Sequence, residues 1–250
     1  MNSGIAVIVL AAGLGKRMKS EKAKVLHEVL GKPMVVHVVE AARQVAGTVI
    51  VVVGNQAEDV RRVVSRSADA LYAHQDRQLG TGHAVMCALP HLPEGCEQIV
   101  ILCGDAPLVR ASTLKGLVRD HLKHGRDVTL LAVDLERPSG YGRVLLDRDG
   151  RLSGIVEEAD ADEDQRAVRT INSGIYCVSR RFLAEALPRL DRRNAQSEYY
   201  LTDIIRLGYG DQRVIGVCRG EDPDEILGVN TPEDLRRVES VLAARKSEVS

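Results

Sequence analysis

Continuous runs of apolar residues recur along the chain, and each run ends at or near a glycine. Three of them extend over Ile5–Leu10, Thr48–Val53 and Gln98–Cys103, and each contains several valines or isoleucines. Short uninterrupted runs of this kind are typical of strands that are buried on both faces of a parallel sheet. We therefore expect these three segments to form the centre of one sheet.

Segments with helical spacing of apolar residues lie between the runs. Residues 33–46 place Val35, Val38 and Val39 on one face, and Pro33 suits the first turn of a helix. The alternation of strand and helix predicts right-handed parallel βαβ units. The same patterns predict further helices over residues 58–65, 84–89, 112–124, 180–190 and 233–244, and further strands over 70–75, 127–135, 144–146, 151–157, 170–176 and 213–217.

Polar turn residues add detail to this outline. Asp147-Arg148-Asp149-Gly150 separates two short apolar runs and predicts a hairpin, and Ser112 is expected to cap the helix that follows it. Together the elements predict an α/β fold with a mixed, mostly parallel central sheet flanked by helices and a small β-hairpin lobe. At this length we expect a single domain over residues 1–250.

The overall composition indicates which kinds of binding partner the chain is not expected to have. The chain has 34 basic and 35 acidic residues and only 3% aromatic residues, so we expect no nucleic-acid partner, which would normally require excess positive charge and stacking rings. Its five cysteines are scattered and form no C-x-x-C pair, which favours reduced thiols in a cytoplasmic protein. No apolar segment approaches the roughly 20 residues that span a membrane, so we expect no membrane partner.

A small-residue loop, Ala11-Ala12-Gly13-Leu14-Gly15, follows the first strand and leads to the cations Arg17 and Lys24. Small residues let main-chain N–H groups approach an anion closely, and the cations can hold phosphate oxygens. Arg17 and Met18 break the P-loop and dinucleotide-binding patterns, respectively, so neither of those loops is present. The alternative is an ordinary strand-to-helix loop with solvated cations.

A second glycine-rich loop follows the strand predicted over residues 70–75. Gly80 and Gly82 allow the chain to lie close to a flat ring, and the amide of Gln75 offers a donor and an acceptor. The edge of a uracil base presents the complementary groups. The residues themselves are equally compatible with a simple turn before the next helix.

Two oxygen-bearing side chains could hold a metal ion. Asp105 stands just beyond a buried strand, where ligands bind in open α/β sheets, and Asn230 precedes the helix predicted over residues 233–244. Carboxylate and amide oxygens suit Mg²⁺. Each residue has an alternative role: Asp105 would cap the turn before Pro107, and Asn230 would cap the helix, for which Thr231 competes.

Several of these segments resemble one family. LAAGLGKRM (residues 10–18) is similar to the N-terminal signature of the sugar nucleotidyltransferases, and KVLHEVLGKPM (residues 24–34) is similar, more narrowly, to the uridylyltransferases that make UDP-N-acetylglucosamine. Further motifs of that group follow in the family's order along almost the whole chain: QLGTGHA, GDAPL, GYGR, IVE, NSGI, NAQSEYYLTD and GVN.

The resemblance implies a Rossmann-like nucleotide-diphospho-sugar transferase fold and a definite reaction. A uridylyl group would pass from UTP to N-acetylglucosamine-1-phosphate by direct in-line displacement of pyrophosphate, with Mg²⁺ as cofactor, giving a precursor of cell-wall peptidoglycan. By the same resemblance, Arg17 and Lys24 are catalytic, and Asp105 and Asn230 hold the metal. The implied nucleotide contacts are Leu10, Ala11, Ala12, Gly13, Gly15, Gln75, Gly80, Thr81, Cys103 and Gly104, and the implied sugar contacts are Gly140, Glu157, Asn172, Glu198 and Tyr200.

The chain departs from the family pattern at two places. Cys103 stands where this group often has Tyr, and Glu158-Ala159 stands where it commonly has His-Lys. The alternatives are therefore a sister nucleotidyltransferase with another sugar or base, and a non-catalytic regulator that binds a sugar nucleotide. Bifunctional members continue into a trimeric left-handed β-helix with acetyltransferase activity. Residues 1–250 contain no such hexapeptide repeats, so we expect neither that activity nor that trimer, and the oligomeric state stays open.

Overall fold

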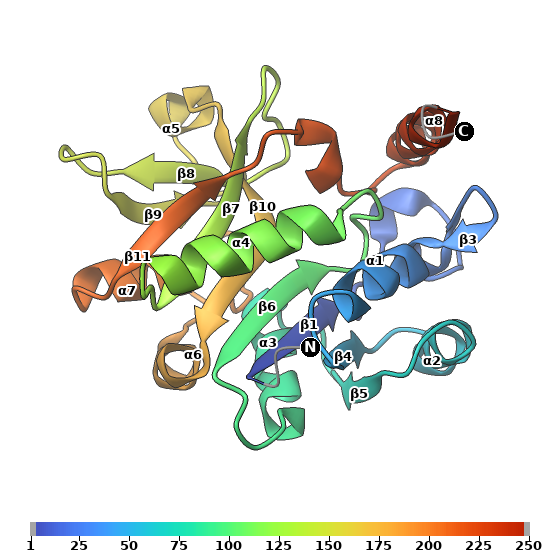
Figure 1. The fold of residues 1–250 in the computed structure, drawn as a ribbon. Coiled ribbons are helices and arrows are strands. Elements are labelled where there is room, and N and C mark those ends of the chain that lie inside the picture. Colours follow the sequence, from blue (N-terminus) through green and yellow to red (C-terminus); the bar gives the residue numbers. More distant parts are fainter. Residues whose placement is uncertain (1–3, 248–250) are drawn as a thin grey trace.

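A mixed β-sheet runs through the centre of the computed structural model, which describes residues 4–247 except for the side chain of Lys16 (Figure 1). Seven strands lie in the order β11-β7-β10-β6-β1-β4-β5. Only β10 runs antiparallel to its neighbours on this path, which are β6 and β7. The strands are β1 (Ile5–Leu10), β4 (Thr48–Val53), β5 (Leu71–His74), β6 (Gln98–Cys103), β7 (Val128–Asp134), β10 (Thr170–Ser179) and β11 (Ile215–Arg219).

A hairpin branches from β10, inside this order of strands. Strands β8 (Arg143–Leu146) and β9 (Leu152–Val156) pair with each other, and Arg143 of β8 pairs with Ile171 of β10. The hairpin and helix α5 (Glu163–Ala167) project together at the upper left of Figure 1. A separate two-stranded sheet joins β2 (Glu28–Val29) to β3 (Lys32–Pro33). The predicted α/β fold with its mostly parallel sheet and small hairpin lobe is confirmed.

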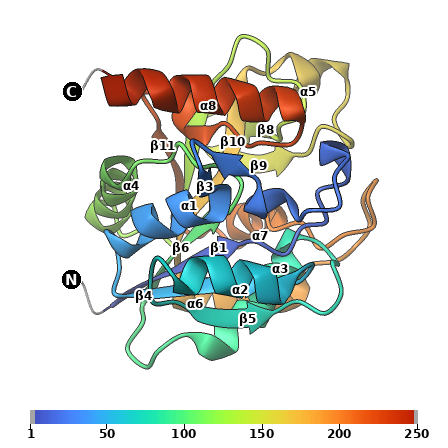
Figure 2. The ribbon, with the colours of Figure 1, turned by 90° about the vertical axis from the view of Figure 1, so that its right-hand side faces the viewer.

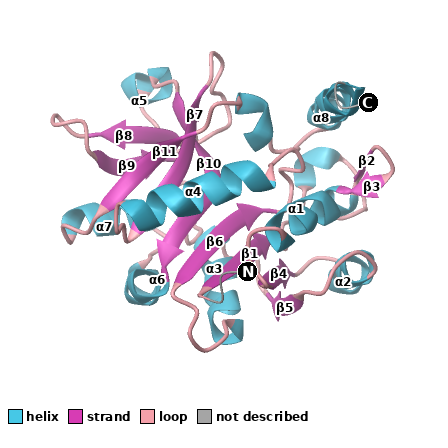
Figure 3. Ribbon diagram, viewed as in Figure 1, coloured by secondary structure: helices cyan, strands magenta, loops and turns pink. Residues whose placement is uncertain are grey.

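Helices cover both faces of the central sheet (Figure 3). One face is covered by α1 (Met34–Arg43), α2 (Ala57–Ser65) and α4 (Ala111–Lys123), and the other by α3 (Thr81–Ala88), α6 (Arg180–Ala186) and α7 (Asp203–Gly210). No helix within residues 4–247 is long and apolar enough to cross a membrane. Short 3-10 helices occupy Lys16–Met18, Lys24–Leu26, Leu89–His91, Leu187–Arg189 and Pro223–Ile226.

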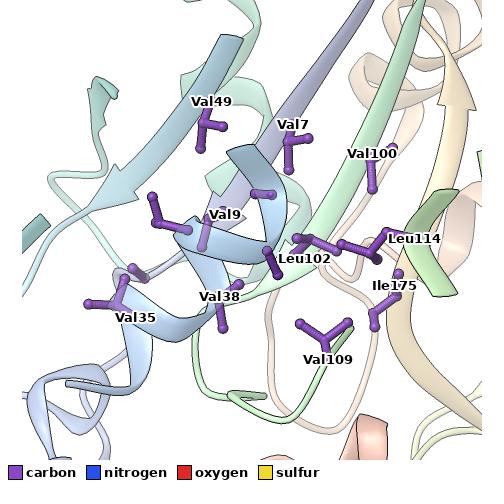
Figure 4. Packing of buried hydrophobic residues seen from close by; sticks show 14 of the residues in the cluster. Val7, Val9, Val35, Val38, Val49, Val100, Leu102, Val109, Leu114 and Ile175 are labelled. Atoms are coloured by element: carbon purple, nitrogen blue, oxygen red, sulfur yellow. The ribbon is translucent and has the colours of Figure 1, made fainter. Parts of the chain in front are cut away.

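The two faces of the sheet have separate hydrophobic cores. Val7 and Val9 of β1 pack in the core under α1 and α4, whereas Ala6 and Ile8 pack in the core on the side of α3 and α6. Figure 4 shows Val7 and Val9 of β1 in the first core, with Val9 near Val35 and Val38 of α1. Successive side chains of a strand point to opposite faces, so a strand covered on both sides places nearly all of its side chains in an apolar core. This explains the continuous apolar runs of the sequence.

The last helix, α8 (Pro232–Ser247), lies away from the sheet and crosses one end of the molecule (Figure 2). Its Val238 is buried in a third cluster together with Met18, Val29 and Met34. Met18 belongs to the 3-10 helix that follows the first glycine-rich loop. Helix α8 therefore supports that loop from outside the central sheet.

Some element boundaries differ from the expected ones. Helix α3 begins at Thr81 rather than at residue 84, with Gly80 as its N-cap. Ser112 is not the N-cap of α4, because Arg110 occupies that position and Ser112 lies in the first turn. Helix α1 begins after Pro33, which ends β3 instead of opening the helix.

Candidate active site

A cavity of about 510 Å³ opens where β1 and β6 end and α3 begins. This is the edge of the sheet at which ligands bind in α/β folds. The cavity brings together residues from five separate parts of the chain. The expected site residues that line it are Leu10, Ala12, Gly13, Gly15, Arg17, Lys24, Gln75, Gly80, Thr81, Cys103, Asp105, Glu198 and Asn230.

Gly15 allows the first loop to lie directly on Lys24. Its φ of +62° is in the left-handed region, and a Cβ atom there would lie 2.6 Å from the Cβ of Lys24. Any other residue would push the loop away from the lysine. The sequence thus holds the small-residue loop and the cation in contact on one wall of the cavity.

Four polar side chains meet at this wall. The Lys24 ammonium is paired with the Asp105 carboxylate and lies 3.0 Å from Asn230 Oδ1, and Arg17 donates to the same Asn230 oxygen at 2.9 Å. The side chains of Lys24 and Asp105 are only 16% and 18% exposed, so water screens this pair less than it screens a surface ion pair. Two expected catalytic cations and two expected metal ligands therefore form one cluster.

The roles of Asn230 and Asp105 as caps are not observed. The hydroxyl of Thr231 accepts from the Asp234 amide at 3.2 Å and so caps α8, which leaves the Asn230 side chain to face Lys24. Asp105 likewise directs its carboxylate to Lys24, and its carbonyl accepts from the Val229 amide at 2.9 Å. This main-chain bond ties the segment before α8 to the end of β6, and so it holds Asn230 next to Asp105.

The donor set of Asp105 and Asn230 fits a small divalent cation. Two hard oxygen atoms already converge on one positive charge, the Lys24 ammonium, and Mg²⁺ is typically held by one or two carboxylate or carbonyl groups together with substrate phosphates. The described residues contain no group of three His, Cys, Asp or Glu side chains that could hold a metal ion. Magnesium at this place would therefore share its coordination with phosphate oxygens and water.

Gln75 also lines this cavity. Its side chain is 3% exposed, and its Nε2 donates to the Gly80 carbonyl at 3.1 Å and lies 3.0 Å from His83 Nδ1. A carbonyl accepts hydrogen bonds but cannot donate them, so the amide nitrogen must face Gly80. The side-chain oxygen of Gln75 therefore points away from Gly80, and it is the acceptor available to a ligand.

The loop before α7 closes the cavity on the side of α3. The Tyr199 amide donates to the Leu79 carbonyl at 2.8 Å, the Gly82 amide donates to the Tyr199 carbonyl at 2.8 Å, and the Leu201 amide donates to the Thr81 hydroxyl at 3.0 Å. A Cβ atom at Gly80, whose φ is +110°, would lie 2.6 Å from the Tyr199 carbonyl oxygen. These contacts bring Glu198 to the cavity wall.

Six expected site residues do not line this cavity. The amides of Ala11 and Gly104 donate to the carbonyls of Val52 and Leu10, both at 2.9 Å, so they belong to the sheet framework. The other four lie in and around the hairpin lobe. They are Gly140, Glu157, Asn172 and Tyr200.

Polar contacts within the protein hold three of these four side chains. Asn172 Oδ1 accepts from the Gly174 amide and from the Tyr176 hydroxyl, both at 2.9 Å. The Tyr200 hydroxyl donates to Asp160 at 3.1 Å, and Glu157 accepts from the Thr202 hydroxyl at 3.2 Å. The structure thus gathers them near one another, but in a region beside the main cavity.

Burial raises the pKa of two side chains, Cys103 in the main cavity and Glu157 in the region beside it. Burial, reinforced by the neighbouring Asp105 carboxylate and opposed by Lys24, raises the pKa of the Cys103 thiol to about 12. Burial also raises the pKa of Glu157, an effect that the nearby acidic groups Asp160 and Asp203 reinforce. Cys103 is therefore a neutral thiol at physiological pH, and its S–H faces the Gly174 carbonyl at 3.7 Å.

Sequence reasoning did not single out five of the residues that line the cavity. Gln78 lies in the motif QLGTG, and Gln196 lies in the motif NAQSE. Each of the two residues contributes an amide group to the wall of the cavity. The apolar members carry no chemical signal that a single sequence could reveal. They are Leu14, Val25 and Ala84.

The fold and this site define a nucleotidyltransferase of the α/β class. A family model described as the MobA-like NTP transferase domain matches residues 7–203, and the chain belongs to this family. Two similar curated proteins are each named Bifunctional protein GlmU. The one from Trichlorobacter lovleyi is 44% identical to this chain, and the match covers 96% of this chain and 52% of the relative. The one from Pelobacter propionicus is 46% identical, and the match covers 96% of this chain and 53% of the relative. The chain thus spans about half the length of these relatives.

A solved structure agrees on the fold. A crystal structure from Bacillus anthracis, described as a glucose-1-phosphate thymidylyltransferase in complex with sucrose, superposes with a TM-score of 0.75 and covers 95% of this chain and 94% of its own. The two sequences are 18% identical. At this distance the similarity concerns the architecture of the domain alone.

Proposed function

We propose that this chain transfers a uridylyl group from UTP to N-acetylglucosamine-1-phosphate and releases pyrophosphate. The observation that carries the proposal is the cluster of Arg17, Lys24, Asp105 and Asn230 in a cavity that Gln75 also lines. The family motifs around these residues favour the uridylyl group and the amino sugar. Residues 1–250 would form one nucleotidyltransferase domain.

The chemistry requires alignment more than a reactive side chain. An oxygen of the sugar phosphate attacks the α-phosphorus of UTP, the bond from that phosphorus to the oxygen that bridges the α- and β-phosphates breaks, and pyrophosphate leaves with that oxygen. Positioned charges stabilise such a transition state. Lys24 would neutralise the α-phosphate, and Arg17, which is exposed at the mouth of the cavity, would hold the departing pyrophosphate.

The base would be read at Gln75. The N3–H group of uracil is a donor, and the side-chain oxygen of Gln75 is an acceptor whose direction is fixed by the Gly80 carbonyl. Cytosine has no N–H at this position, so it would leave a buried acceptor without a partner, which is costly. Thymine shares the uracil edge, and this contact would not distinguish the two.

Mg²⁺ would be held by Asp105 and Asn230 and would supply positive charge to the phosphate oxygens. In the structure, the Lys24 ammonium contacts the side-chain oxygen atoms of both of these residues. A triphosphate in the cavity would attract the ammonium and so release the two oxygen atoms. Binding of the nucleotide and of the metal would therefore support each other.

The experiment is an assay of pyrophosphate release with Mg²⁺. UTP, dTTP, CTP and GTP are each tested with N-acetylglucosamine-1-phosphate, glucose-1-phosphate and galactose-1-phosphate. Fast turnover with UTP and N-acetylglucosamine-1-phosphate supports the proposal. Turnover with another pair would assign the chain to a sister activity, and tight sugar-nucleotide binding without any turnover would indicate the non-catalytic regulator.

A further inference from the structure

Arg143 carries a guanidinium group that is buried beside the loop of residues 138–142. The residue is 2% exposed and opens β8. Its Nη2 lies 2.7 Å from Glu158 Oε2, its Nη1 donates to the Tyr141 carbonyl, and its buried Nε has no partner within the described residues. A guanidinium remains charged in proteins, so a buried one depends strongly on its carboxylate partner.

Glu158 has a second contact on the same oxygen. Its Oε2 also accepts a hydrogen bond from the Gly140 amide at 3.3 Å. Partial burial raises the pKa of Glu158, but the hydrogen bond and the charge of Arg143 lower it more, so the side chain is an anion at neutral pH. One carboxylate oxygen therefore joins a buried cation to the main chain of the loop.

The loop is anchored at its other end beside the region of the expected sugar contacts. The Asn172 amide donates to the Gly142 carbonyl at 2.9 Å. A Cβ atom at Gly142 would lie 3.3 Å from Glu157 Oε2, so the loop packs against that carboxylate. Glu157 and Glu158 are adjacent in the chain, and they lie against the same short loop at Gly142 and Gly140.

We propose that Glu158 is a positioning residue for the sugar phosphate. Through Arg143 and the Gly140 amide it holds the loop of residues 138–142 at a fixed distance from Glu157 and Asn172. Glu158 itself touches no substrate. The inference rests on the proposed function, since it assigns this loop to the acceptor sugar rather than to the nucleotide.

The test compares Glu158→Ala with Glu158→Gln in the assay of pyrophosphate release. In the alanine variant we expect the KM for N-acetylglucosamine-1-phosphate to rise about tenfold, the effect of losing one charge-assisted hydrogen bond, while the KM for UTP changes less than about twofold. The glutamine variant keeps an acceptor for Gly140 and for Arg143, so it should recover part of the loss. Glu163→Ala, at an exposed position in α5, is the matched control.

If Glu158→Ala acted only by destabilising the protein, a second substitution that restores stability would also restore the KM. Arg143→Met in the Glu158→Ala background removes the unpaired buried charge, so it should recover thermal stability. The positioning role predicts that the raised KM for the sugar phosphate persists in this double variant, and that the Gly140 amide exchanges with deuterium faster than in the wild type. Recovery of KM together with stability would overturn the role.

Different results would overturn the proposed function and the role of Glu158. A wild-type chain that turns over none of the substrate pairs would overturn the proposed function and this role of Glu158 with it. A wild-type chain that is active, with an alanine variant that keeps the wild-type KM for the sugar phosphate, would overturn only the role of Glu158. An equal rise of both KM values would also overturn it, because the loop would then not be specific to the sugar.

Discussion

At the scale of single residues, the function depends on which charges meet. Lys24 is the central member of its cluster, because its ammonium contacts both Asp105 and Asn230. A divalent cation and this ammonium cannot share the two oxygen atoms at close range. Lys24 is thus an internal counter-charge, and it would have to move for the proposed metal ion to bind.

Replacing Lys24 should therefore strengthen metal binding in the absence of nucleotide. For Lys24→Met we expect Mn²⁺, used as a paramagnetic substitute for Mg²⁺, to bind on the order of tenfold more tightly, since a like charge next to the ligands is removed. Turnover should fall at the same time. Electron paramagnetic resonance measures the free Mn²⁺, with the exposed Lys19→Met as control, and an unchanged dissociation constant would contradict the account.

Arg17 is predicted to act mainly on the rate. It is exposed, and within residues 4–247 its side chain hydrogen-bonds to Asn230 alone, so its removal should leave the fold intact. For Arg17→Ala we expect kcat to fall about 100-fold, the usual loss for a donor that stabilises developing charge. Arg17→Lys should retain part of the activity. A near wild-type kcat in the alanine variant would remove Arg17 from the mechanism.

At the scale of elements, the sequence predicted strands better than it predicted helix ends. β1, β4 and β6 have the expected bounds because an uninterrupted β-branched run, buried on both sides, permits little else. Helix α3 begins earlier than expected because its start depends on a distant contact: Leu201 donates to the Thr81 hydroxyl. No local pattern around residue 81 contains that information.

In the candidate site, too, some features follow from the local sequence and others depend on contacts between distant residues. Asp105 and Asn230 each had a capping role as an alternative, and only the folded chain shows that Thr231 caps α8 and that Lys24 pairs with Asp105. Conversely, the hairpin lobe carries expected sugar contacts that stand beside the main cavity. Their distance from it follows from the course of β9 and β10, which the motifs do not encode.

The end of β9 also allows a prediction on stability. Burial, reinforced by neighbouring carboxylates, raises the pKa of Glu157 above its value in the unfolded chain. The folded state therefore binds the proton more tightly, so this residue favours folding at low pH and its contribution is lost as the pH rises through the folded pKa. It opposes folding at neutral pH.

Glu157→Gln should accordingly stabilise the protein at pH 7.5, while binding of the sugar phosphate is weakened. We expect the melting temperature to rise by about 1–3 °C at this pH, with a smaller difference at pH 4. Scanning calorimetry at the two pH values measures both quantities. A variant that melts lower than the wild type at pH 7.5 would show that Glu157 is well compensated in the fold.

At the scale of the whole molecule, the central sheet and the segment before α8 meet at one cavity. The ends of β1 and β6 lead to the first loop and to Asp105, the segment before α8 supplies Asn230, and α8 itself packs on Met18. The hairpin lobe and the loop that Glu158 contacts lie beside this cavity. Helix α8 is thus part of the active region although its residues lie last in the chain. Its packing should influence catalysis from a distance.

Weakening the third hydrophobic cluster tests this link. Val238 is 1% exposed, and Val238→Ala should lower the free energy of unfolding by about 1–2 kcal/mol. It should also reduce kcat more than the control Leu122→Ala does, because Met18 is adjacent to Arg17 and Leu122 is exposed on α4. Equal kcat values in the two variants at a temperature where both are folded would argue against a role for α8.

The central claim is that the uridylyl group is transferred to an oxygen of the sugar phosphate, with release of pyrophosphate. The most direct measurement is phosphorus NMR of the wild-type chain with Mg²⁺, UTP and N-acetylglucosamine-1-phosphate labelled with ¹⁸O in its non-bridging phosphate oxygens. The account predicts equal amounts of UDP-N-acetylglucosamine and pyrophosphate, with ¹⁸O in the bridge between the two phosphorus atoms of the product and none in pyrophosphate. Label in pyrophosphate, or no product at all, would contradict it.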